Sequence, residues 1–219
     1  MKVILFGATG MVGQGVLREC LLDPNVEHVL SIVRSATGQQ HVKLTELIHK
    51  DFLDYSTIES QLTGYDTCFF CLGVSSSGMS EESYSRVTYD IPMAAARTLV
   101  RLNPSMTLIF ISGAGTDSTE KSRTMWARVK GKTENALLRL PFKAAYMFRP
   151  GFIQPLHGIQ SKTPVYRIIY AIVKPISPLL KLLFPNHVTT TEHLGRAIIR
   201  VAKNGFPKPI LEARDIDQV

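Results

Sequence analysis

Several features that would place this chain in a special class are scarce or missing. The 219 residues contain no charge-free run of about 18 apolar residues, so the sequence offers no membrane-spanning helix. There are only three cysteines, Cys20, Cys68 and Cys71, and an odd number argues against a disulfide scaffold. A reducing, cytoplasmic setting is expected. Strand-like residues and a glycine loop begin at Met1, so no signal peptide is expected before the fold.

Acidic residues are missing from one long segment. From Asn135 to Thr191 there is no Asp or Glu, and the net charge of the chain is +7. The seven basic residues in this segment are Arg139, Lys143, Arg149, Lys162, Arg167, Lys174 and Lys181. A solvated basic face, an anionic ligand and an anionic lipid surface all remain open, the membrane surface being less favoured. Nucleic acid is not expected, because the basic residues are dispersed and no recognition motif accompanies them.

The most informative feature that is present is a glycine motif at the N-terminus. The apolar run Val3–Phe6 leads directly into Gly7-x-x-Gly10-x-x-Gly13, and apolar residues then follow at helical spacing. A buried strand, a tight turn and a helix N-terminus in this order form the pyrophosphate site of dinucleotide-binding proteins. The residues expected to meet a dinucleotide cofactor here are Gly7, Thr9, Gly10, Met11, Val12 and Gly13.

Strand and helix signals alternate along the rest of the chain. The expected strands are Lys2–Phe6, His28–Val33, Val42–His49, Thr67–Leu72, Thr107–Ile111, Ala144–Phe148 and Pro209–Glu212. The expected helices are Met11–Leu22, Ser56–Gln61, Glu81–Leu102, Thr119–Arg139 and Thr191–Asn204. This alternation predicts one α/β domain over residues 1–219, a doubly wound parallel sheet of the Rossmann type. We expect the strand order 3-2-1-4-5-6, with a seventh strand at the edge.

Two segments need a special interpretation. Pro92 interrupts the third helix, which is expected to kink there or to restart with Asp90 as its cap. Residues 163–185 carry an apolar helical stripe broken by Pro175 and Pro178. We expect about residues 152–190 to form a small substrate-side lid, with a dimer contact or a membrane-surface contact as alternatives. The chain is expected to be a monomer or a homodimer.

The residues after the second strand predict which dinucleotide binds. Val33 is followed by Arg34 and no acid lies nearby, which favours NADP over NAD, because a guanidinium suits a 2′-phosphate. Asp51 and Phe52 follow the third strand, where a carboxylate and an aromatic ring could meet the adenine. Small residues at the end of the fourth strand, Leu72 and Gly73, allow close approach of the cofactor.

A metal site is not expected. Cys68 and Cys71 match C-x-x-C, but they lie in an apolar strand, where residues three apart point to opposite faces. We therefore interpret both as core residues. The histidines at 157, 187 and 193 show no metal-ligand spacing with acids or cysteines.

The motifs taken together resemble a known family. They are Gly7-Ala8-Thr9-Gly10-Met11-Val12-Gly13, Arg34, Asp51-Phe52, Cys71-Leu72-Gly73, Ile111-Ser112, Val129-Lys130-Gly131 and Arg149-Pro150-Gly151. Over essentially its full length the chain resembles the atypical short-chain dehydrogenase/reductases, in particular the small Tat-interacting-protein oxidoreductase-like branch. The resemblance implies that Pro150 belongs to the cofactor site.

The resemblance also implies an active site. The family uses a Ser at the end of strand five and a Tyr-x-x-x-Lys on the next helix, which fall on Ser112 and Lys130, but Trp126 stands at the tyrosine position. An indole N–H can donate a hydrogen bond but does not release its proton near neutral pH. Tyr84 and Tyr89 are candidate substitutes. Two functions follow: an NADP(H) oxidoreductase acting on a small carbonyl or hydroxyl substrate with altered proton-donor chemistry, or a cofactor-binding regulatory protein with little turnover.

Overall fold

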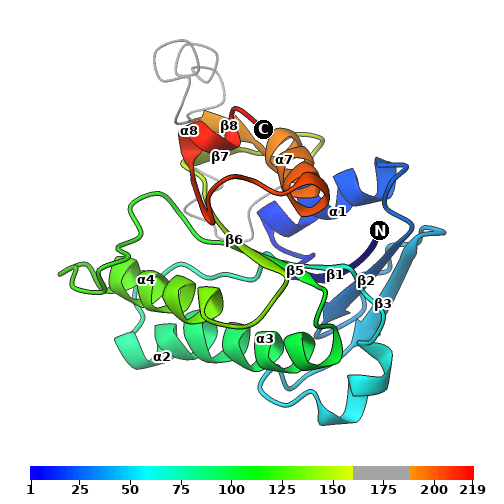
Figure 1. The fold of residues 1–219 in the computed structure, drawn as a ribbon, viewed down its shortest axis with the longest axis horizontal. Coiled ribbons are helices and arrows are strands. Elements are labelled where there is room, and N and C mark those ends of the chain that lie inside the picture. The colour runs from blue at the N-terminus through cyan, green and yellow to red at the C-terminus, as the bar shows by residue number, and fades with distance from the viewer. Residues whose placement is uncertain (160–187) are drawn as a thin grey trace.

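The computed structural model describes residues 1–159 and 188–219, and its centre is one parallel sheet (Figure 1). The strand order β3-β2-β1-β4-β5-β6-β9 confirms the expected 3-2-1-4-5-6 order with a further strand at the edge. The strands are β1 (Lys2–Phe6), β2 (His28–Val33), β3 (Leu44–Ile48), β4 (Thr67–Phe70), β5 (Thr107–Ile111), β6 (Ala144–Arg149) and β9 (Ile210–Glu212). All neighbouring strands in this sheet are parallel. The doubly wound α/β domain is therefore confirmed.

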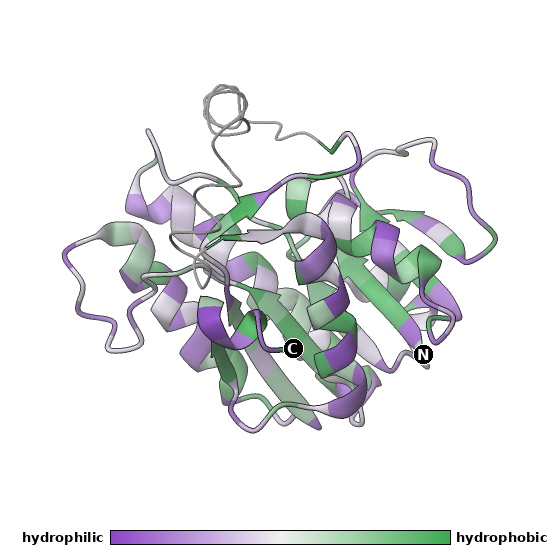
Figure 2. Cartoon of the chain, turned by 90° about the horizontal axis from the view of Figure 1, so that it is seen from above, coloured by the Kyte–Doolittle hydropathy of each residue, from purple (hydrophilic) through white to green (hydrophobic). Residues whose placement is uncertain are grey.

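Helices cover both faces of the sheet. On one face lie α1 (Met11–Leu22) and α7 (Thr191–Asn204), and on the other lie α3 (Ile91–Leu102) and α4 (Met125–Leu138) (Figure 1). Alternate residues of β1 supply the two cores: Val3 and Leu5 pack with α1 and α7, while Ile4 and Phe6 pack with α3. Figure 2 shows that the strands between the helices are largely hydrophobic, as burial on both faces requires.

The two cysteines of the C-x-x-C motif follow the same alternation. Cys68 is buried in the core beside α3, whereas Cys71 packs against the core beside α1 and α7. Burial raises the pKa of both thiols, which keeps them protonated and unreactive. Within residues 1–159 and 188–219 no cluster of His, Cys, Asp or Glu could hold a metal ion.

The fourth expected helix starts later than predicted. It begins at Met125 and not at Thr119. The Asp117 carboxylate accepts hydrogen bonds from the backbone N–H groups of Thr119 (2.9 Å), Lys121 (2.9 Å) and Ser122 (2.6 Å). These bonds close a turn in which Glu120 takes the left-handed conformation, with φ +61°, and an α-helix cannot run through such a residue. A hydrogen bond from the Thr119 hydroxyl (2.7 Å), together with these backbone hydrogen bonds, lowers the pKa of Asp117 to about 2.

The helix around Pro92 continues without a new cap. A short α2 (Glu81–Ser85) runs through a π-helical turn, η2 (Arg86–Asp90), into α3. The expected cap is wrong: Asp90 has helical dihedrals, φ −66° and ψ −45°, and its side chain caps nothing. The wider π turn changes the hydrogen-bond pattern just before Pro92, so the ring lies in the first turn of α3, where its missing N–H costs little.

The C-terminal part adds a second, smaller sheet that was not predicted. Strands β7 (Phe152–Gln154) and β8 (Val188–Thr190) pair in parallel beyond the end of β6, and the short α8 (Ala213–Ile216) follows β9. The expected lid over residues 152–190 and the stripe at 163–185 fall mostly on residues 160–187, which lie outside the described residues. No helix in the described part is long and apolar enough to cross a membrane.

Candidate functional site

The glycine loop joins β1 to α1 with two glycines that the backbone requires. Gly7 has φ +83°, and a Cβ atom there would lie 2.6 Å from the carbonyl carbon of Cys71. A Cβ on Gly13 would lie 2.0 Å from the Gly7 carbonyl oxygen. Glycine at these two positions therefore lets α1 pack closely against the strands, as the motif predicts.

Gly10 differs from Gly7 and Gly13, because its backbone conformation does not require glycine. Since Gly10 has no side chain, the first backbone amides of α1 stay accessible to a ligand. Its φ is −82°, and the closest atom to a Cβ there is the Gly7 carbonyl oxygen at 3.4 Å. It caps α1 with no side-chain hydrogen bond, and the first turn contains no acidic residue. The free amides and the helix dipole at this end suit an anion, so the loop fits the pyrophosphate of a dinucleotide.

The two glycines give a matched pair of substitutions. We expect Gly13→Ala to lower the free energy of unfolding by about 3 kcal/mol, because the atoms its Cβ would strike are backbone atoms that cannot move aside. Gly10→Ala should lower the free energy of unfolding by less than about 1 kcal/mol, since its dihedrals are ordinary. It should nevertheless weaken dinucleotide binding at least about tenfold, because the added methyl group would stand between the helix and the phosphate. Urea unfolding and calorimetric titration measure the two effects. Equal losses of stability would contradict this division of roles.

The other predicted cofactor residues occupy the carboxyl edge of the sheet. Arg34 directly follows β2 and is exposed, and Leu72 and Gly73 follow β4. Asp51 is exposed and its carboxylate accepts a hydrogen bond from the Leu53 N–H at 3.0 Å. Phe52 is buried, with its ring edge-on to Phe6 at 6.0 Å. The Phe52 ring therefore packs in the core below this edge and leaves Asp51 facing solvent.

A cleft of about 350 Å³ opens beside this edge, beyond the ends of β4, β5 and β6. The residues that line it are Val74, Ser75, Ser76, Tyr84, Gly113, Ala114, Trp126, Lys130, Pro150 and Gly151. It thus brings together Lys130 and Pro150 from the predicted site, Trp126 at the tyrosine position and one of the two substitute tyrosines, Tyr84. The other, Tyr89, lies with its ring 4.7 Å from the Lys132 ammonium and does not line the cleft.

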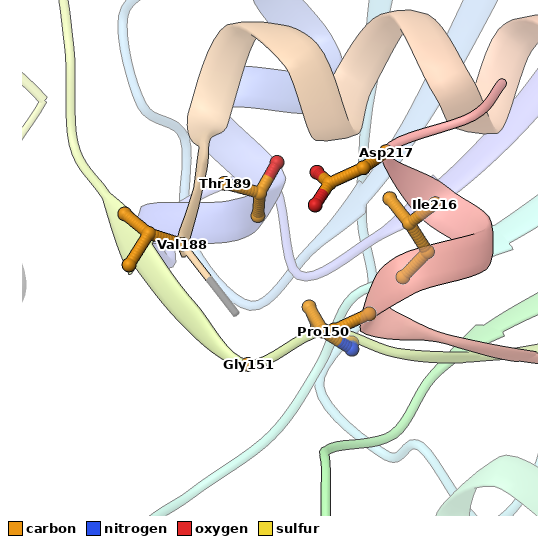
Figure 3. Close-up of a pocket in the computed structure, with 7 residues that line it drawn as sticks. Pro150, Gly151, Val188, Thr189, Ile216 and Asp217 are labelled. Atoms are coloured by element: carbon orange, nitrogen blue, oxygen red, sulfur yellow. The ribbon is translucent and has the colours of Figure 1, made fainter. Parts of the chain in front are cut away.

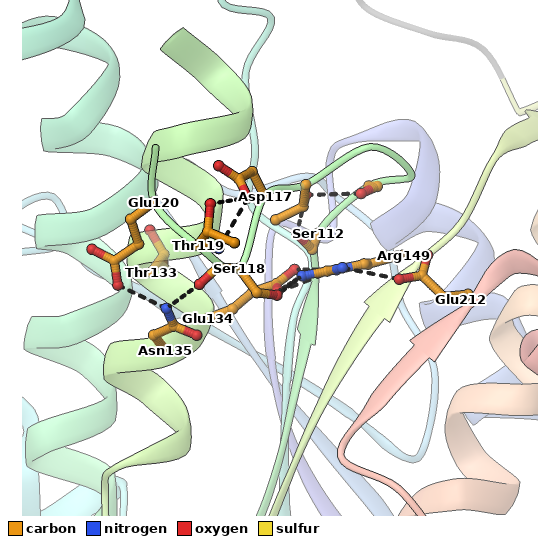
Figure 4. Close-up of polar contacts among 12 residues, drawn as sticks. Ser112, Asp117, Ser118, Thr119, Glu120, Thr133, Glu134, Asn135, Arg149 and Glu212 are labelled. Atoms are coloured by element: carbon orange, nitrogen blue, oxygen red, sulfur yellow. Dashed lines mark hydrogen bonds and ion pairs between the residues drawn. The ribbon is translucent and has the colours of Figure 1, made fainter. Parts of the chain in front are cut away.

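Ser112 does not line this cleft, although the next residue, Gly113, does. It is buried at the end of β5, and its Oγ is 3.0 Å from Thr116 Oγ1 (Figure 4). Thr116 in turn donates to the carbonyl oxygen of Gly113 at 2.8 Å, so the Ser112 hydroxyl is the donor to Thr116. Thr116 was not among the residues predicted for the site, although its hydroxyl, four residues after Ser112, is visible in the sequence.

Trp126 and Lys130 reach the cleft from one helix. α4 begins at Met125, so the two residues lie one turn apart on the same face. The edge of the Trp126 ring faces Gly115, which has φ +84°. A Cβ atom on Gly115 would lie only 3.3 Å from the ring. A glycine at 115 therefore makes room for the indole, which is larger than a phenol ring.

Lys130 is a cation in poorly hydrated surroundings. Its Nζ lies 5.8 Å from the centre of the Phe110 ring. Burial lowers the pKa of Lys130 to about 8, and the Glu134 carboxylate partly opposes that shift. Within the part of the chain that the structure describes, no carboxylate or hydrogen-bond acceptor contacts this ammonium group. An unpaired lysine ammonium here fits the ribose hydroxyls of a nicotinamide nucleotide.

A buried ion pair fixes α4 to the end of β6 (Figure 4). Arg149 donates from Nε to Glu134 (3.1 Å), from Nη1 to Glu212 (2.9 Å) and from Nη2 to the hydroxyl of Ser118 (2.6 Å). Glu134 is completely buried and Arg149 is 7% exposed. Arg149 therefore stabilises the fold and does not belong to a solvated basic face. This corrects the expectation for one of the seven basic residues in the acid-free segment.

A second hollow, on the other side of Pro150 and Gly151, is too narrow to admit water (Figure 3). It lies between that turn, the β8 residues Val188 and Thr189 and the end of the chain at Ile216. The Thr189 hydroxyl there is buried and has no hydrogen-bond partner among residues 1–159 and 188–219. The hollow is a packing gap, so the cleft beside Lys130 is the candidate site.

Comparison with solved structures places this geometry in a known fold. An oxidoreductase of the short-chain dehydrogenase/reductase family from Burkholderia thailandensis matches with a TM-score of 0.71 at 14% identity, over 98% of this chain and 91% of that one. The dTDP-glucose 4,6-dehydratase DesIV from Streptomyces venezuelae, with NAD bound, matches with a TM-score of 0.71 at 17% identity, over 97% and 75%. This chain has the Rossmann fold of the short-chain dehydrogenase/reductases.

Among curated proteins, short relatives from fungi are similar in sequence. Protein fmp52, mitochondrial, from Emericella nidulans is 29% identical over 159 residues, which are 69% of this chain and 66% of that protein. Protein FMP52-2, mitochondrial, from Scheffersomyces stipitis is 25% identical over 210 residues, 93% of this chain and 88% of that protein. The match spans just under two thirds of the first of these relatives. No protein-family model matches the chain.

The names of these relatives correct the cellular compartment that was expected for this protein. Several are named as mitochondrial proteins, so the expectation of a cytoplasmic protein is wrong. The expectation rested on the odd cysteine count. Cys20 and Cys68 are buried in the cores of the fold, so these thiols serve packing and do not identify one reducing compartment over another.

Proposed function

We propose that this chain binds NADP(H) and acts as a slow oxidoreductase on a small carbonyl or hydroxyl compound. The observation that carries the proposal is the cleft in which Lys130 and Trp126 lie together, beside Pro150 and beyond the ends of β4, β5 and β6, of which β4 is the neighbour of β1. Solved neighbours of the same fold support a nicotinamide cofactor, among them WbmF from Bordetella bronchiseptica in complex with NAD⁺ (TM-score 0.68, 14% identity).

The residues of the candidate site can be assigned to parts of the cofactor and the substrate by their chemistry. The free amides at the start of α1 would hold the pyrophosphate, and Lys130 would hold the ribose hydroxyls. Arg34 would pair with a 2′-phosphate. The cofactor supplies hydride chemistry when bound. The Trp126 indole can orient a substrate oxygen by a hydrogen bond, but it keeps its proton, so turnover is expected to be slow.

A cofactor-binding regulatory protein is the second candidate, and Trp126 is the observation that favours it. A screen of NADPH oxidation against aldehydes, ketones and quinones separates the two functions. Measurable turnover that saturates with substrate supports the oxidoreductase. Tight NADPH binding with no turnover on any of the compounds supports the regulatory protein.

Cofactor preference gives a direct test of Arg34. We expect NADPH to bind more tightly than NADH by about 1–3 kcal/mol, roughly 5- to 150-fold, the range of charge-assisted hydrogen bonds. Calorimetric titration of both nucleotides measures this difference. Arg34→Ala should abolish the preference, while Arg97→Ala, which removes another exposed arginine on α3, should leave it intact. Equal affinities in the natural chain would rule out the NADP assignment.

A further inference from the structure

The cleft contains two side chains that could release a proton to a substrate. Among the described residues that line it, Tyr84 and Lys130 carry titratable protons, while Trp126 does not give up its own. The Ser112 hydroxyl is committed to Thr116. We propose that Lys130 itself donates the proton to the substrate oxygen, in the role that a tyrosine at position 126 would have. This inference rests on the proposed function and adds the identity of the acid.

The ammonium group of Lys130 has three protons, so one remains for the substrate while the others bind the ribose hydroxyls. Lys130 lines the cleft directly, and no acceptor in the described part of the chain holds its protons. The nearest acid on the same helix is Glu134, one turn further along, and Glu134 is engaged by Arg149 through both of its carboxylate oxygens. A lysine bound to a carboxylate would be a poor acid, because the ion pair holds the proton on nitrogen.

The charges on the elements around Lys130 set its acidity. From α4 comes Glu134 and from β6 comes Arg149, and these two offset each other as a buried pair. From α2 comes the phenol of Tyr84, while Glu81 of α2 is half exposed and pairs with Arg128 of α4. Burial therefore dominates and lowers the pKa of Lys130 to about 8. A general acid works best when its pKa lies near the working pH.

The proton transfer balances with hydride transfer. In reduction, the carbonyl carbon gains a hydride from NADPH, the reductant, which is oxidised to NADP⁺. The N–H bond at Lys130 Nζ breaks as an O–H bond forms on the former carbonyl oxygen. The neutral amine then takes a proton from water. Reduction therefore requires the ammonium form, so its rate should fall by about tenfold per pH unit above the pKa.

The first test reads the amine without any turnover. The whole protein is treated with acetic anhydride over a pH series, and acetylation of Lys130 is followed by peptide mass spectrometry with the exposed Lys121 as internal reference. Only the neutral amine reacts, so acetylation of Lys130 should rise with a midpoint near pH 8. A midpoint at the ordinary lysine value of about 10.4 would overturn the proposal.

The second test compares two variants. Lys130→Arg keeps the charge and the N–H donors that the ribose hydroxyls need, but it cannot release a proton, so turnover should fall by about 10²-fold or more while NADPH binding changes far less than turnover. Lys130→Gln should lose turnover similarly, which guards against a folding artefact of the larger arginine. Turnover that survives in both variants would overturn the proposal.

The third arm addresses Tyr84. In Tyr84→Phe turnover should persist, and the pH midpoint of its rate should stay near 8. Loss of all turnover or of the pH dependence in Tyr84→Phe would instead identify Tyr84 as the acid. A natural chain that binds NADPH but reduces no carbonyl until Trp126→Tyr is made would also overturn the role of Lys130. Failure to bind NADPH, measured by calorimetry, would instead reject the proposed function itself.

Discussion

Trp126→Tyr should raise the rate of NADPH oxidation about 10²-fold on at least one aldehyde, ketone or quinone. The substitution places a phenol one helical turn from Lys130, in the cleft where the indole now lies. A positioned general acid contributes about 10²–10⁴-fold to such reactions, and the lower end is expected because Lys130 already supplies part of this effect. Steady-state assays at saturating NADPH measure the gain, and cofactor affinity should change little.

Trp126→Phe is the matched control for this gain. It removes the indole and enlarges the cleft without adding an acid, so its rate should stay within a few-fold of the natural chain. If Trp126→Phe gained as much as Trp126→Tyr, relief of crowding over the substrate and not proton donation would be the cause. Brisk turnover by the natural chain would show that no acid is missing.

Arg149→Met should lower the free energy of unfolding by about 3–5 kcal/mol, because it leaves the completely buried Glu134 without its cation. Urea unfolding measures the change. The double variant Arg149→Met with Glu134→Met should recover part of the loss, since apolar side chains can replace a buried pair.

The control for the Arg149→Met variant is a substitution of Glu212, the more exposed of the two acids that pair with Arg149. Glu212 is 41% exposed, and glutamine keeps an oxygen that can accept from Arg149 and cap α8, so Glu212→Gln should cost less than about 1 kcal/mol. Comparable losses in Arg149→Met and Glu212→Gln would contradict the view that the Glu134 contact is the important one.

The fold was predictable because its signals are local. Apolar runs such as Val3–Phe6 indicate buried parallel strands, and the Gly7 and Gly13 positions follow from a turn whose sterics are the same in every such loop. The placement of Trp126 one turn before Lys130 also follows from spacing on a single helix. These predictions needed no knowledge of contacts between distant segments.

What escaped prediction depends on contacts across the chain or on side-chain capping. The ion pair of Glu134 with Arg149 joins a helix to a strand, and no local sequence pattern predicts that these two residues meet. The late start of α4 depends on the Asp117 carboxylate folding back onto three amides. Which substitute tyrosine reaches the cleft was likewise open, because Tyr84 and Tyr89 differ by little more than one helical turn and only packing distinguishes them.

Fluorescence of Trp126 tests the central claim most directly, because it is the only tryptophan of the chain and lines the candidate cleft. Reduced nicotinamide absorbs where tryptophan emits, so a nicotinamide bound in this cleft must quench Trp126 and emit in its place. Titration with NADPH should give saturable quenching with sensitised nicotinamide emission, and Gly10→Ala should shift the titration to higher concentration. NADPH binding, shown by calorimetry, without energy transfer from Trp126 would contradict the account, because the nicotinamide would then lie elsewhere.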